Sequence, residues 1–316
     1  MKKVLIIGST VVDVIITLEE YLPKRQEDVH VRSQKMSLGG CAYNTSDIIR
    51  HFYVPYTLFS PVGTGAYGDF VRTQLQNKGI RTPLPTPDRD NGCCYCFIEK
   101  DGERTFFSYH GAEYLFEKEW FDLIPAEEYD AVYICGIEIE EKTGVHIVEW
   151  LEQHPELTVY FAPGPRLVRM DSVLVNRILA LHPVIHLNDA EVCMFMDYYT
   201  GKASEDITNN NAAITSEHLE SSAHALFELT QNTVIVTLGP DGAYYKSQET
   251  CGYIPGISAN QIDTIGAGDS HIGSVIACRQ LGMSYADAIM TANKVAAKVV
   301  ETEGALLSDE AFRNLF

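Results

Sequence analysis

The sequence predicts an α/β fold in which a mostly parallel central sheet is covered by helices on both faces. Short apolar runs alternate with segments of helical length through most of the chain, which is typical of parallel strands joined by helices. Of the 316 residues, 46% are hydrophobic and 21% are charged, a composition that supplies a substantial core. No low-complexity linker or fixed repeat divides the chain, so we expect one domain over residues 1–316.

The strands of the central sheet are predicted from apolar runs short enough for buried strands. They are Val4–Ile7, Thr57–Phe59, Ala131–Cys135, Thr158–Phe161, Val184–Leu187 and Thr233–Leu238. The predicted helices are Ala42–Phe52, Phe70–Lys78, Thr143–Gln153, Val173–Ala180, Leu219–Leu229, Ala267–Leu281 and Tyr285–Val300. Residues Ser204–Glu220, which include three consecutive asparagines, are predicted to form a surface loop leading into a helix.

Two pairs of segments interrupt this alternation and have the pattern of hairpin strands with polar turns. They are Val12–Leu18 with Val29–Ser37, and Gly92–Glu99 with Arg104–Tyr109. We expect them to form a small β-sheet lid over the main sheet, from about residues 12–38 and 91–110. Because uncovered strand edges invite pairing with a second chain, a homodimer joined through the lids is also predicted. Apolar lid residues that would support it are Val29, Val31, Tyr95 and Phe97.

The charge and the apolar runs limit where the protein acts. A net charge of −19 argues against nucleic acid, because a phosphate backbone requires a basic surface, and it disfavours anionic membranes. The N-terminal run Val4–Ile7 is too short for a secretion signal, and no run approaches the roughly 18 apolar residues of a membrane span. A cytoplasmic protein is therefore expected. Cys93, Cys94 and Cys96 lack zinc-site spacing and are interpreted as small buried residues.

The strongest chemical pattern runs from Asp263 to Asp269 and leads directly into a predicted helix. Gly266, Ala267 and Gly268 let the backbone approach a ligand, and the unpaired N–H groups of a helix N-terminus form an anion hole for phosphate. Asp269 would then lie within reach of a hydroxyl that attacks the phosphate. The alternative is that Asp269 only caps the helix and the glycines only form a turn. These residues alone leave both interpretations open.

The same seven residues resemble the DTxGAGD motif of the ribokinase (PfkB) family of carbohydrate kinases. Further family elements match in order: Gly8 and Asp13, Gly39–Asn44 (GGxxxN), Val62–Gly68 (VGxDxxG), Asp101–Thr105 (DGeRT), Gly111–Ala112, Asn188–Glu191 (NxxE), Thr237–Gly242 (TxGxxG), Asn293 and Gly304–Ala305. The resemblance covers nearly the whole chain. It implies a ribokinase-like three-layer sandwich with a β-sheet lid, and an enzyme that transfers phosphate from ATP to an alcohol group.

The resemblance also implies the site residues. Asp269 would be the catalytic base, beside an anion hole formed by Gly266, Ala267 and Gly268. The substrate would be bound by Asp13, Gly39, Gly40 and Asn44. ATP and Mg²⁺ would be bound by Asn188, Glu191, Thr237, Gly239, Gly242 and Asn293. A monovalent cation such as K⁺ would be held, largely through carbonyl oxygens, by Asp263, Ile265, Val299, Gly304 and Ser308.

Some of these residues have a physical reason of their own. The Asp13 carboxylate can accept hydrogen bonds from two neighbouring sugar hydroxyls, and the Asn44 amide can both donate and accept. Asn188 followed by Glu191 also fits a helix-capping box, so a structural role stands beside the functional one. A helix N-terminus should favour the charged form of Asp269, which predicts a carboxylate of ordinary pKa near ~4.

The sequence departs from the family pattern at three places: Gly65 replaces an acid in the VGxDxxG element, His271 stands where Phe is common, and Ala162 precedes Pro163 in the segment that ends at Arg166. These departures leave the acceptor open. We favour a neutral sugar over a nucleoside or a sugar phosphate. Basic lid residues that would suit a sugar phosphate are Lys24, Arg25, Arg32, Lys35 and Arg104. The contrasting hypothesis is a non-catalytic sugar- or nucleotide-binding regulator on the same fold.

Overall fold

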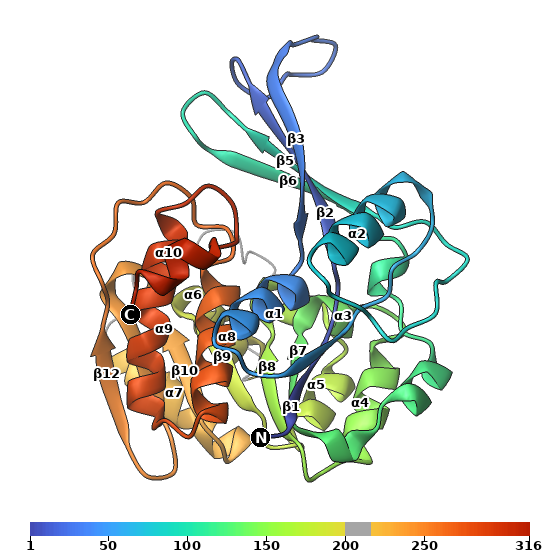
Figure 1. The fold of residues 1–316 in the computed structure, drawn as a ribbon. Helices are drawn as coiled ribbons and strands as arrows, with labels where there is room; N and C mark the ends of the chain where they lie inside the picture. The colour runs from blue at the N-terminus through green and yellow to red at the C-terminus, as the bar shows by residue number, and fades with distance from the viewer. Residues whose placement is uncertain (200–215) are drawn as a thin grey trace.

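The computed structural model describes residues 1–199 and 216–316. An eight-stranded sheet forms the centre, in the order β12-β11-β10-β9-β8-β7-β1-β4 (Figure 1). Its strands are β1 (Lys3–Ile7), β4 (Tyr56–Phe59), β7 (Tyr129–Cys135), β8 (Thr158–Ala162), β9 (Val184–Asn188), β10 (Val234–Thr237), β11 (Gly242–Lys246) and β12 (Cys251–Pro255). All neighbouring pairs from β4 to β10 in this order are parallel. β11 pairs antiparallel with both β10 and β12. The predicted mostly parallel sheet is confirmed.

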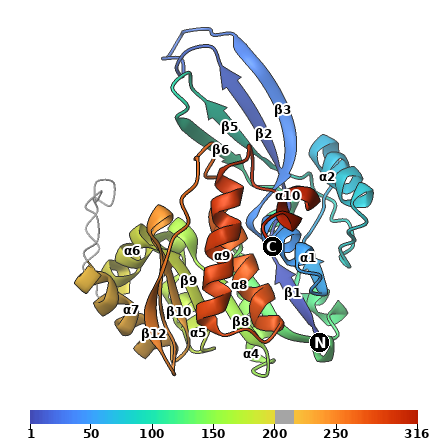
Figure 2. The same cartoon turned by 60° about the vertical axis from the view of Figure 1, so that its left-hand side comes forward.

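Helices cover both faces of this sheet and make three layers (Figures 1 and 2). One face packs against α4 (Gly144–Glu152), α5 (Ser172–Leu179), α6 (Asp189–Tyr199) and α7 (Ser216–Thr230). The other packs against α1 (Cys41–His51), α2 (Gly65–Asn77), α8 (Ala267–Gln280) and α9 (Tyr285–Val300). Two short helices, α3 (Gly136–Glu140) and α10 (Asp309–Arg313), complete the α-helices of the described residues.

The alternation of side chains along the strands explains why two cores form. In β1, Leu5 and Ile7 enter one cluster, whereas Val4 and Ile6 enter the other, and all four side chains are fully buried. Successive residues of a strand point to opposite faces, so a strand buried on both sides is apolar throughout. This is why the short apolar runs were sufficient to predict the strands.

A separate four-stranded sheet, which we call the lid sheet, rises above the carboxyl end of β1 (Figure 1). It consists of β2 (Val11–Leu18), β3 (Val31–Gly39), β5 (Cys93–Ile98) and β6 (Arg104–Tyr109), in the order β3-β2-β5-β6. β2 pairs antiparallel with β3 and parallel with β5. Since β2 follows β1 after three residues, the lid sheet is tied directly to a strand of the main sheet that is paired on both sides.

The structure also differs from the sequence predictions. β11 and β12 were not predicted, because the alternating exposure of β12 at the sheet edge gives no apolar run. α2 begins at Gly65, five residues before the predicted Phe70, since its first turn contains two glycines. Residues 204–215 of the predicted surface loop lie outside the described residues, and the following helix begins at Ser216. Within the described residues, no helix is long and apolar enough to cross a bilayer.

Candidate active site

The motif that ends at Asp269 forms the N-terminus of α8, as predicted. Gly266 adopts a left-handed conformation with φ of +75°, and a Cβ there would lie 2.5 Å from the Ala305 side chain. Only glycine fits this turn without strain. Within the described part of the chain, no acceptor binds the N–H groups of Gly268 or Asp269. These two donors are free to bind an anion.

The structure brings the predicted substrate residues to this helix terminus. The Asn44 Nδ2 atom, on α1, donates a hydrogen bond of 2.8 Å to Oδ2 of Asp269. Asp13 lies on β2 and faces Gly39 so closely that a Cβ at Gly39 would be 1.9 Å from the Asp13 carboxylate. Gly40 then caps the start of α1. Residues far apart in the sequence therefore form one polar cluster beside the anion hole.

Burial changes the acid–base properties of both carboxylates. It raises the pKa of Asp13 from 3.8 to about 7, with a further contribution from the negative charge of Asp269. It raises the pKa of Asp269 to about 6, against hydrogen bonds from Asn44 and the Cys41 thiol that act in the opposite direction. The expectation that Asp269 has an ordinary pKa was wrong. Desolvation of the carboxylate outweighs the stabilisation of its charged form by the helix N-terminus.

Glu138, on α3, is a member of this cluster that the sequence analysis missed. Its side chain is 1% exposed, and its Oε1 accepts a hydrogen bond of 2.8 Å from the Ser9 backbone N–H. Burial raises its pKa to about 7. The Glu138 Oε2 and the Asn44 Oδ1 atoms are buried without a hydrogen-bond partner in the described residues. A buried acceptor without a partner is costly, so a ligand with hydroxyl donors would satisfy both.

A signal for Glu138 was present in the sequence. It follows the apolar run that forms β7 by three residues, at the carboxyl end of a parallel strand. In open α/β sheets, ligands bind beyond this end of the strands.

A pocket of about 260 Å³ adjoins the other side of the anion hole. Four of the predicted nucleotide-binding residues line it, together with Ala267 and Gly268: Thr237, Gly239, Gly242 and Asn293. Its remaining wall is mainly apolar: Pro240, Gly256, Ile257, Ala259, Gln261, Thr264, His271, Ala296, Ala297 and Val300. A flat apolar ring fits such a pocket, with attached phosphates directed to the α8 N-terminus.

His271 has a structural role in this pocket. Asn293 Nδ2 donates to the carbonyl oxygens of Ile254 and Pro255 at 3.3 and 3.0 Å, so its Oδ1 faces His271 Nε2 at 3.1 Å. His271 Nε2 therefore carries the proton, and Nδ1 accepts from His186 Nε2 at 2.9 Å. Burial lowers the pKa of His271 to about 4, which keeps the ring neutral. These consecutive hydrogen bonds through His186, His271 and Asn293 connect β9, α8, α9 and the end of β12.

Asn188 and Glu191 form the reciprocal capping box that their spacing predicted. The Glu191 backbone N–H donates to Asn188 Oδ1 at 2.8 Å, and the Asn188 N–H donates to Glu191 Oε2 at 2.9 Å. Burial raises the pKa of Glu191, with smaller contributions from the charges of Asp189 and Asp269. Because the negative charge of Asp269 contributes to the raised pKa of Glu191, these two carboxylates lie in the same region of the structure. Their predicted role toward Mg²⁺ and phosphate stays a proposal.

The residues predicted to hold a monovalent cation surround Asp263, which is 4% exposed. Its carboxylate accepts backbone N–H bonds of 2.9 Å from both Ile265 and Gly304. It also accepts a hydrogen bond from Arg104 of the lid sheet. The Val299 carbonyl oxygen accepts from the N–H and the hydroxyl of Thr302, and Ser308 caps α10. The Asp263 carboxylate, the Val299 carbonyl oxygen and the Ser308 hydroxyl are thus engaged within the chain, and the predicted cation site stays a proposal.

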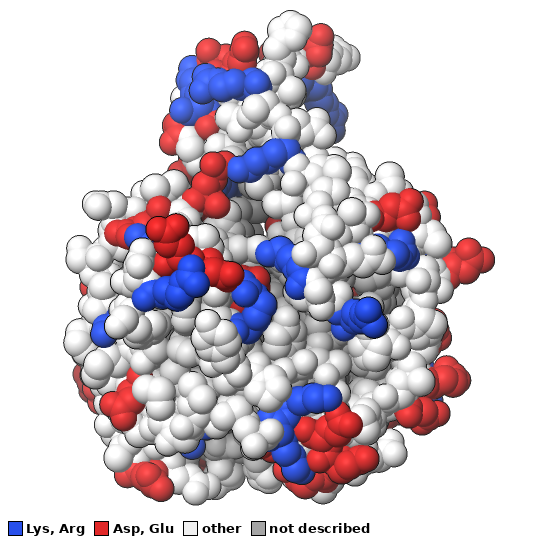
Figure 3. Space-filling view, viewed as in Figure 1, with Lys and Arg blue, Asp and Glu red and all other residues white. Residues whose placement is uncertain are grey.

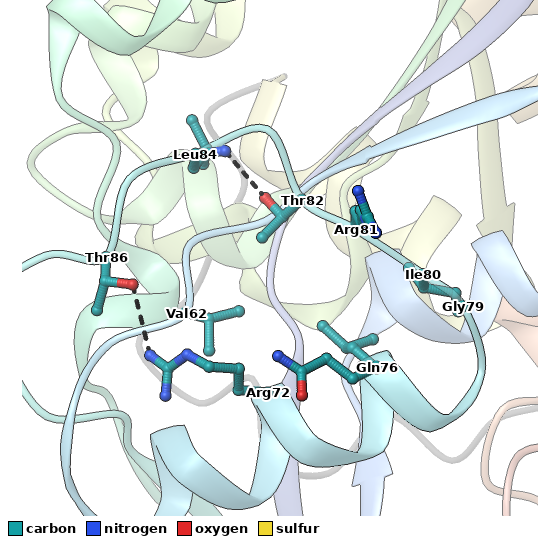
Figure 4. Close-up of a pocket in the computed structure, with 10 residues that line it drawn as sticks. Val62, Arg72, Gln76, Gly79, Ile80, Arg81, Thr82, Leu84 and Thr86 are labelled. Atoms are coloured by element: carbon teal, nitrogen blue, oxygen red, sulfur yellow. Dashed lines mark hydrogen bonds between the residues drawn. The ribbon is translucent and has the colours of Figure 1, made fainter.

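The structure also accounts for the missing acid at position 65. The Asp90 carboxylate occupies the space beside Gly65, where a Cβ would approach it to 2.7 Å, and it accepts a hydrogen bond of 2.7 Å from the Thr64 hydroxyl. Arg72 on α2 supports the same loop by donating to the Gly63 carbonyl at 2.8 Å. Figure 4 shows the Arg72 guanidinium directed toward Thr86 across an adjoining pocket.

Arg166, the last of the departures, pairs with Glu140 of α3.

The geometry described above, an anion hole between a hydroxyl-binding cluster and an apolar pocket, agrees with the comparison to known families. The model of the pfkB family of carbohydrate kinases matches residues 1–311. The chain belongs to the PfkB family. An uncharacterized sugar kinase of Escherichia coli (strain K12), YegV, is 30% identical over 303 residues, which is 96% of this chain and 90% of that protein.

Solved structures share the PfkB fold. Ribokinase of Thermotoga maritima matches with a TM-score of 0.83 at 18% identity, over 100% of this chain and 99% of that one. Arabidopsis thaliana ribokinase complexed with ribose and ATP matches with a TM-score of 0.77 at 16% identity, over 99% and 98%. The predicted ribokinase-like sandwich with a separate small sheet is confirmed.

Proposed function

We propose that this PfkB kinase transfers the γ-phosphoryl group of ATP to a hydroxyl of a small neutral sugar. The observation that carries the proposal is the hydrogen bond between Asn44 and Asp269, because it joins the hydroxyl-binding cluster to the anion hole. YegV and the two ribokinases have names that indicate sugar acceptors.

The acceptor hydroxyl would lie between Asp269 and the α8 N-terminus. Asp13 and Glu138 offer carboxylates, and Asn44 offers an amide, to the remaining hydroxyls of the sugar. Because both carboxylates are buried with raised pKa values, hydrogen bonds from substrate hydroxyls would stabilise their charged forms. A neutral polyol fits this acidic cluster better than an anionic sugar phosphate.

Phosphoryl transfer has a loose transition state, so positioning and charge stabilisation carry most of the catalysis. The free N–H groups of Gly268 and Asp269 would bind the equatorial oxygens of the moving phosphoryl group. Asp269 accepts the proton of the attacking hydroxyl as the new bond forms. Its pKa of about 6 makes it a stronger base than an exposed carboxylate while it stays mostly ionised at neutral pH.

ATP would bind with its adenine ring in the pocket that includes Thr237 and Asn293. Mg²⁺ binds proteins through one or two carboxylates together with substrate phosphates, and Glu191 would be the carboxylate that assists. The ion would neutralise charge on the β- and γ-phosphates.

Two further features belong to this proposal. The protein acts in the cytoplasm, where ATP is available. It forms a homodimer through the lid sheet, whose exposed residues Val31, Phe106, Phe107 and Tyr109 are 49%, 52%, 54% and 63% accessible. On the face in Figure 3, basic and acidic side chains are interspersed, so charge does not oppose contact between copies there.

The test is ATP consumption in the presence of a panel of pentoses, hexoses, sugar acids, sugar phosphates and nucleosides, with Mg²⁺. The expected result is turnover with a neutral sugar that is lost on Asp269→Asn substitution. Turnover with a nucleoside or sugar phosphate alone would contradict the choice of acceptor. ATP and sugar binding without turnover would favour the non-catalytic regulator.

A further inference from the structure

The lid sheet contacts the anion-hole loop through one buried ion pair. Arg104 is the first residue of β6, an edge strand of the lid sheet, and its Nη1 donates to Oδ1 of Asp263. The side chains of Arg104 and Asp263 are 18% and 4% exposed. The two residues are 159 positions apart in the sequence, so this contact is created by the tertiary fold.

Asp263 controls the loop that builds the anion hole. One carboxylate oxygen binds the Ile265 N–H and the other binds the Gly304 N–H, each at 2.9 Å. The carboxylate therefore joins residues 263–265 to residue 304, beside the place where Gly266 packs on Ala305. Three residues later the chain reaches the N–H donors of α8. A change in the Asp263 carboxylate is transmitted to these donors through a short, tightly bonded loop.

A buried carboxylate needs a compensating charge. The Asp263 carboxylate is 4% exposed, and it accepts hydrogen bonds from Arg104 and from the backbone N–H groups of Ile265 and Gly304. The family resemblance implies a different positive charge nearby, a monovalent cation held largely through carbonyl oxygens of residues that include Asp263. In this structure the guanidinium contacts the carboxylate itself, and the Val299 carbonyl is already bonded twice by Thr302. A guanidinium at the Asp263 carboxylate would repel a second cation held beside it, so these residues fit an arginine better than a K⁺ ion.

We propose that Arg104 is a positioning residue that replaces the monovalent cation by bringing its own positive charge to Asp263 from the lid sheet. The inference rests on the proposed phosphoryl transfer. Asp13, on β2 of the same sheet, belongs to the sugar cluster. The sheet that carries Asp13 over the sugar therefore also holds the anion-hole loop, through an ion pair that is formed in this structure without a sugar.

A second ion pair at the same junction provides a matched control. Lys35 of β3 contacts Glu303, but both side chains are exposed, at 48% and 65%. A screened surface pair contributes little. Glu303→Gln therefore removes a link between the lid sheet and the segment that contains Gly304 without leaving a buried charge.

The experiment has three arms. First, the rate of the unmodified enzyme is measured with KCl and with tetramethylammonium chloride at equal ionic strength. Second, kcat and both KM values are measured for Arg104→Gln, Arg104→Lys and Glu303→Gln. Third, hydrogen exchange of the amides of residues 263–268 is measured in the same variants without substrates. Arg104→Gln is paired with Arg104→Gln/Asp263→Asn, in which no buried charge is left unpaired.

The proposal predicts equal rates in the two salts, within about twofold. It predicts a fall in kcat of about tenfold to a hundredfold for Arg104→Gln, the scale of a small misplacement of catalytic groups, with sugar and ATP KM values changed less than threefold. Arg104→Lys should restore most of the rate, and Glu303→Gln should match the unmodified enzyme. Exchange of residues 263–268 should speed up in Arg104→Gln and return toward the unmodified rate in the double variant.

A rate that depends tenfold or more on K⁺ in the unmodified enzyme would overturn the proposal. Unchanged kcat and unchanged exchange in Arg104→Gln would also overturn it. If no acceptor supports ATP consumption, the proposed function fails, but the exchange measurement still decides whether Arg104 orders the anion-hole loop.

Discussion

Replacing Asp13 by Asn should stabilise the protein while it damages the substrate site. The Asp13 carboxylate is buried beside Gly39 and close to the charge of Asp269, and these surroundings raise its pKa from 3.8 to about 7. Asn has nearly the same shape and no charge. The substitution therefore removes the cost of burying the ionised group and leaves the packing in place.

The sign of the pH dependence follows from linkage. A group whose pKa is raised in the folded state stabilises the fold below its unfolded pKa, and this contribution is lost as the pH rises through the folded pKa. For Asp13 the window runs from about pH 4 to about pH 7. With about 1.4 kcal/mol per pH unit, the cost of Asp13 relative to a neutral residue is about 2 kcal/mol at pH 5 and about 4 kcal/mol at pH 8.

The assay is urea unfolding of the unmodified protein and of Asp13→Asn at pH 5 and pH 8, without ligands. We expect the free energy of unfolding of the variant to exceed that of the unmodified protein at both pH values, and by about 2 kcal/mol more at pH 8. Asp122→Asn, at an exposed carboxylate of the main body, is the control and should show no such difference. A variant that is less stable than the unmodified protein at pH 8, or a gain that does not depend on pH, would refute the reasoning.

Four further outcomes are expected. Asp13→Ala should weaken sugar binding about ten- to a hundredfold, since charged hydrogen bonds contribute roughly 1.5–3 kcal/mol, and leave ATP binding intact; unchanged sugar affinity by calorimetry would remove Asp13 from the site. Glu138→Gln should raise the sugar KM, because a buried acceptor for a hydroxyl is lost, and an unchanged KM would give Glu138 a structural role only. Between pH 5 and pH 8, kcat should rise as Asp269 loses its proton, with an apparent pKa near about 6; a flat profile would argue against Asp269 as the base. Light scattering at tens of micromolar should give the mass of a dimer, and a monomeric mass would end the proposal of lid pairing.

Local patterns in the sequence predicted most of the fold. The six apolar runs became β1, β4, β7, β8, β9 and β10, because most positions of strands covered on both faces are buried and therefore apolar. The turn residues between hairpin strands placed the lid sheet. β12 escaped prediction because its residues alternate in exposure at the sheet edge, and β11 escaped it because its apolar run, Ala243–Tyr245, is only three residues long.

The sequence predicted the parts of the site that depend on local backbone conformation. It missed the parts that depend on contacts between residues far apart in the sequence. The glycines around Asp269 indicated a helix terminus that binds anions, and the structure places one there. The position of Glu138 after the β7 run was a usable signal, but only the tertiary contact with Ser9 shows that its carboxylate is buried in the site. The pairing of Arg104 with Asp263 joins two motifs that each looked complete alone. The pKa of Asp269 depends on burial, which no local pattern reveals.

The central claim is that Asp269 accepts the proton during phosphoryl transfer. The most direct measurement is kcat for Asp269→Asn with the sugar that the screen identifies, together with ATP affinity and thermal unfolding of the variant. Asn keeps the shape of the side chain and the contact with Asn44 and removes the proton acceptor. The account predicts a kcat lower by roughly 10²–10⁴, the span for loss of a general base, with ATP affinity and folding retained. A folded variant that turns over within a few-fold of the unmodified enzyme would contradict it and leave Asp269 as a helix cap.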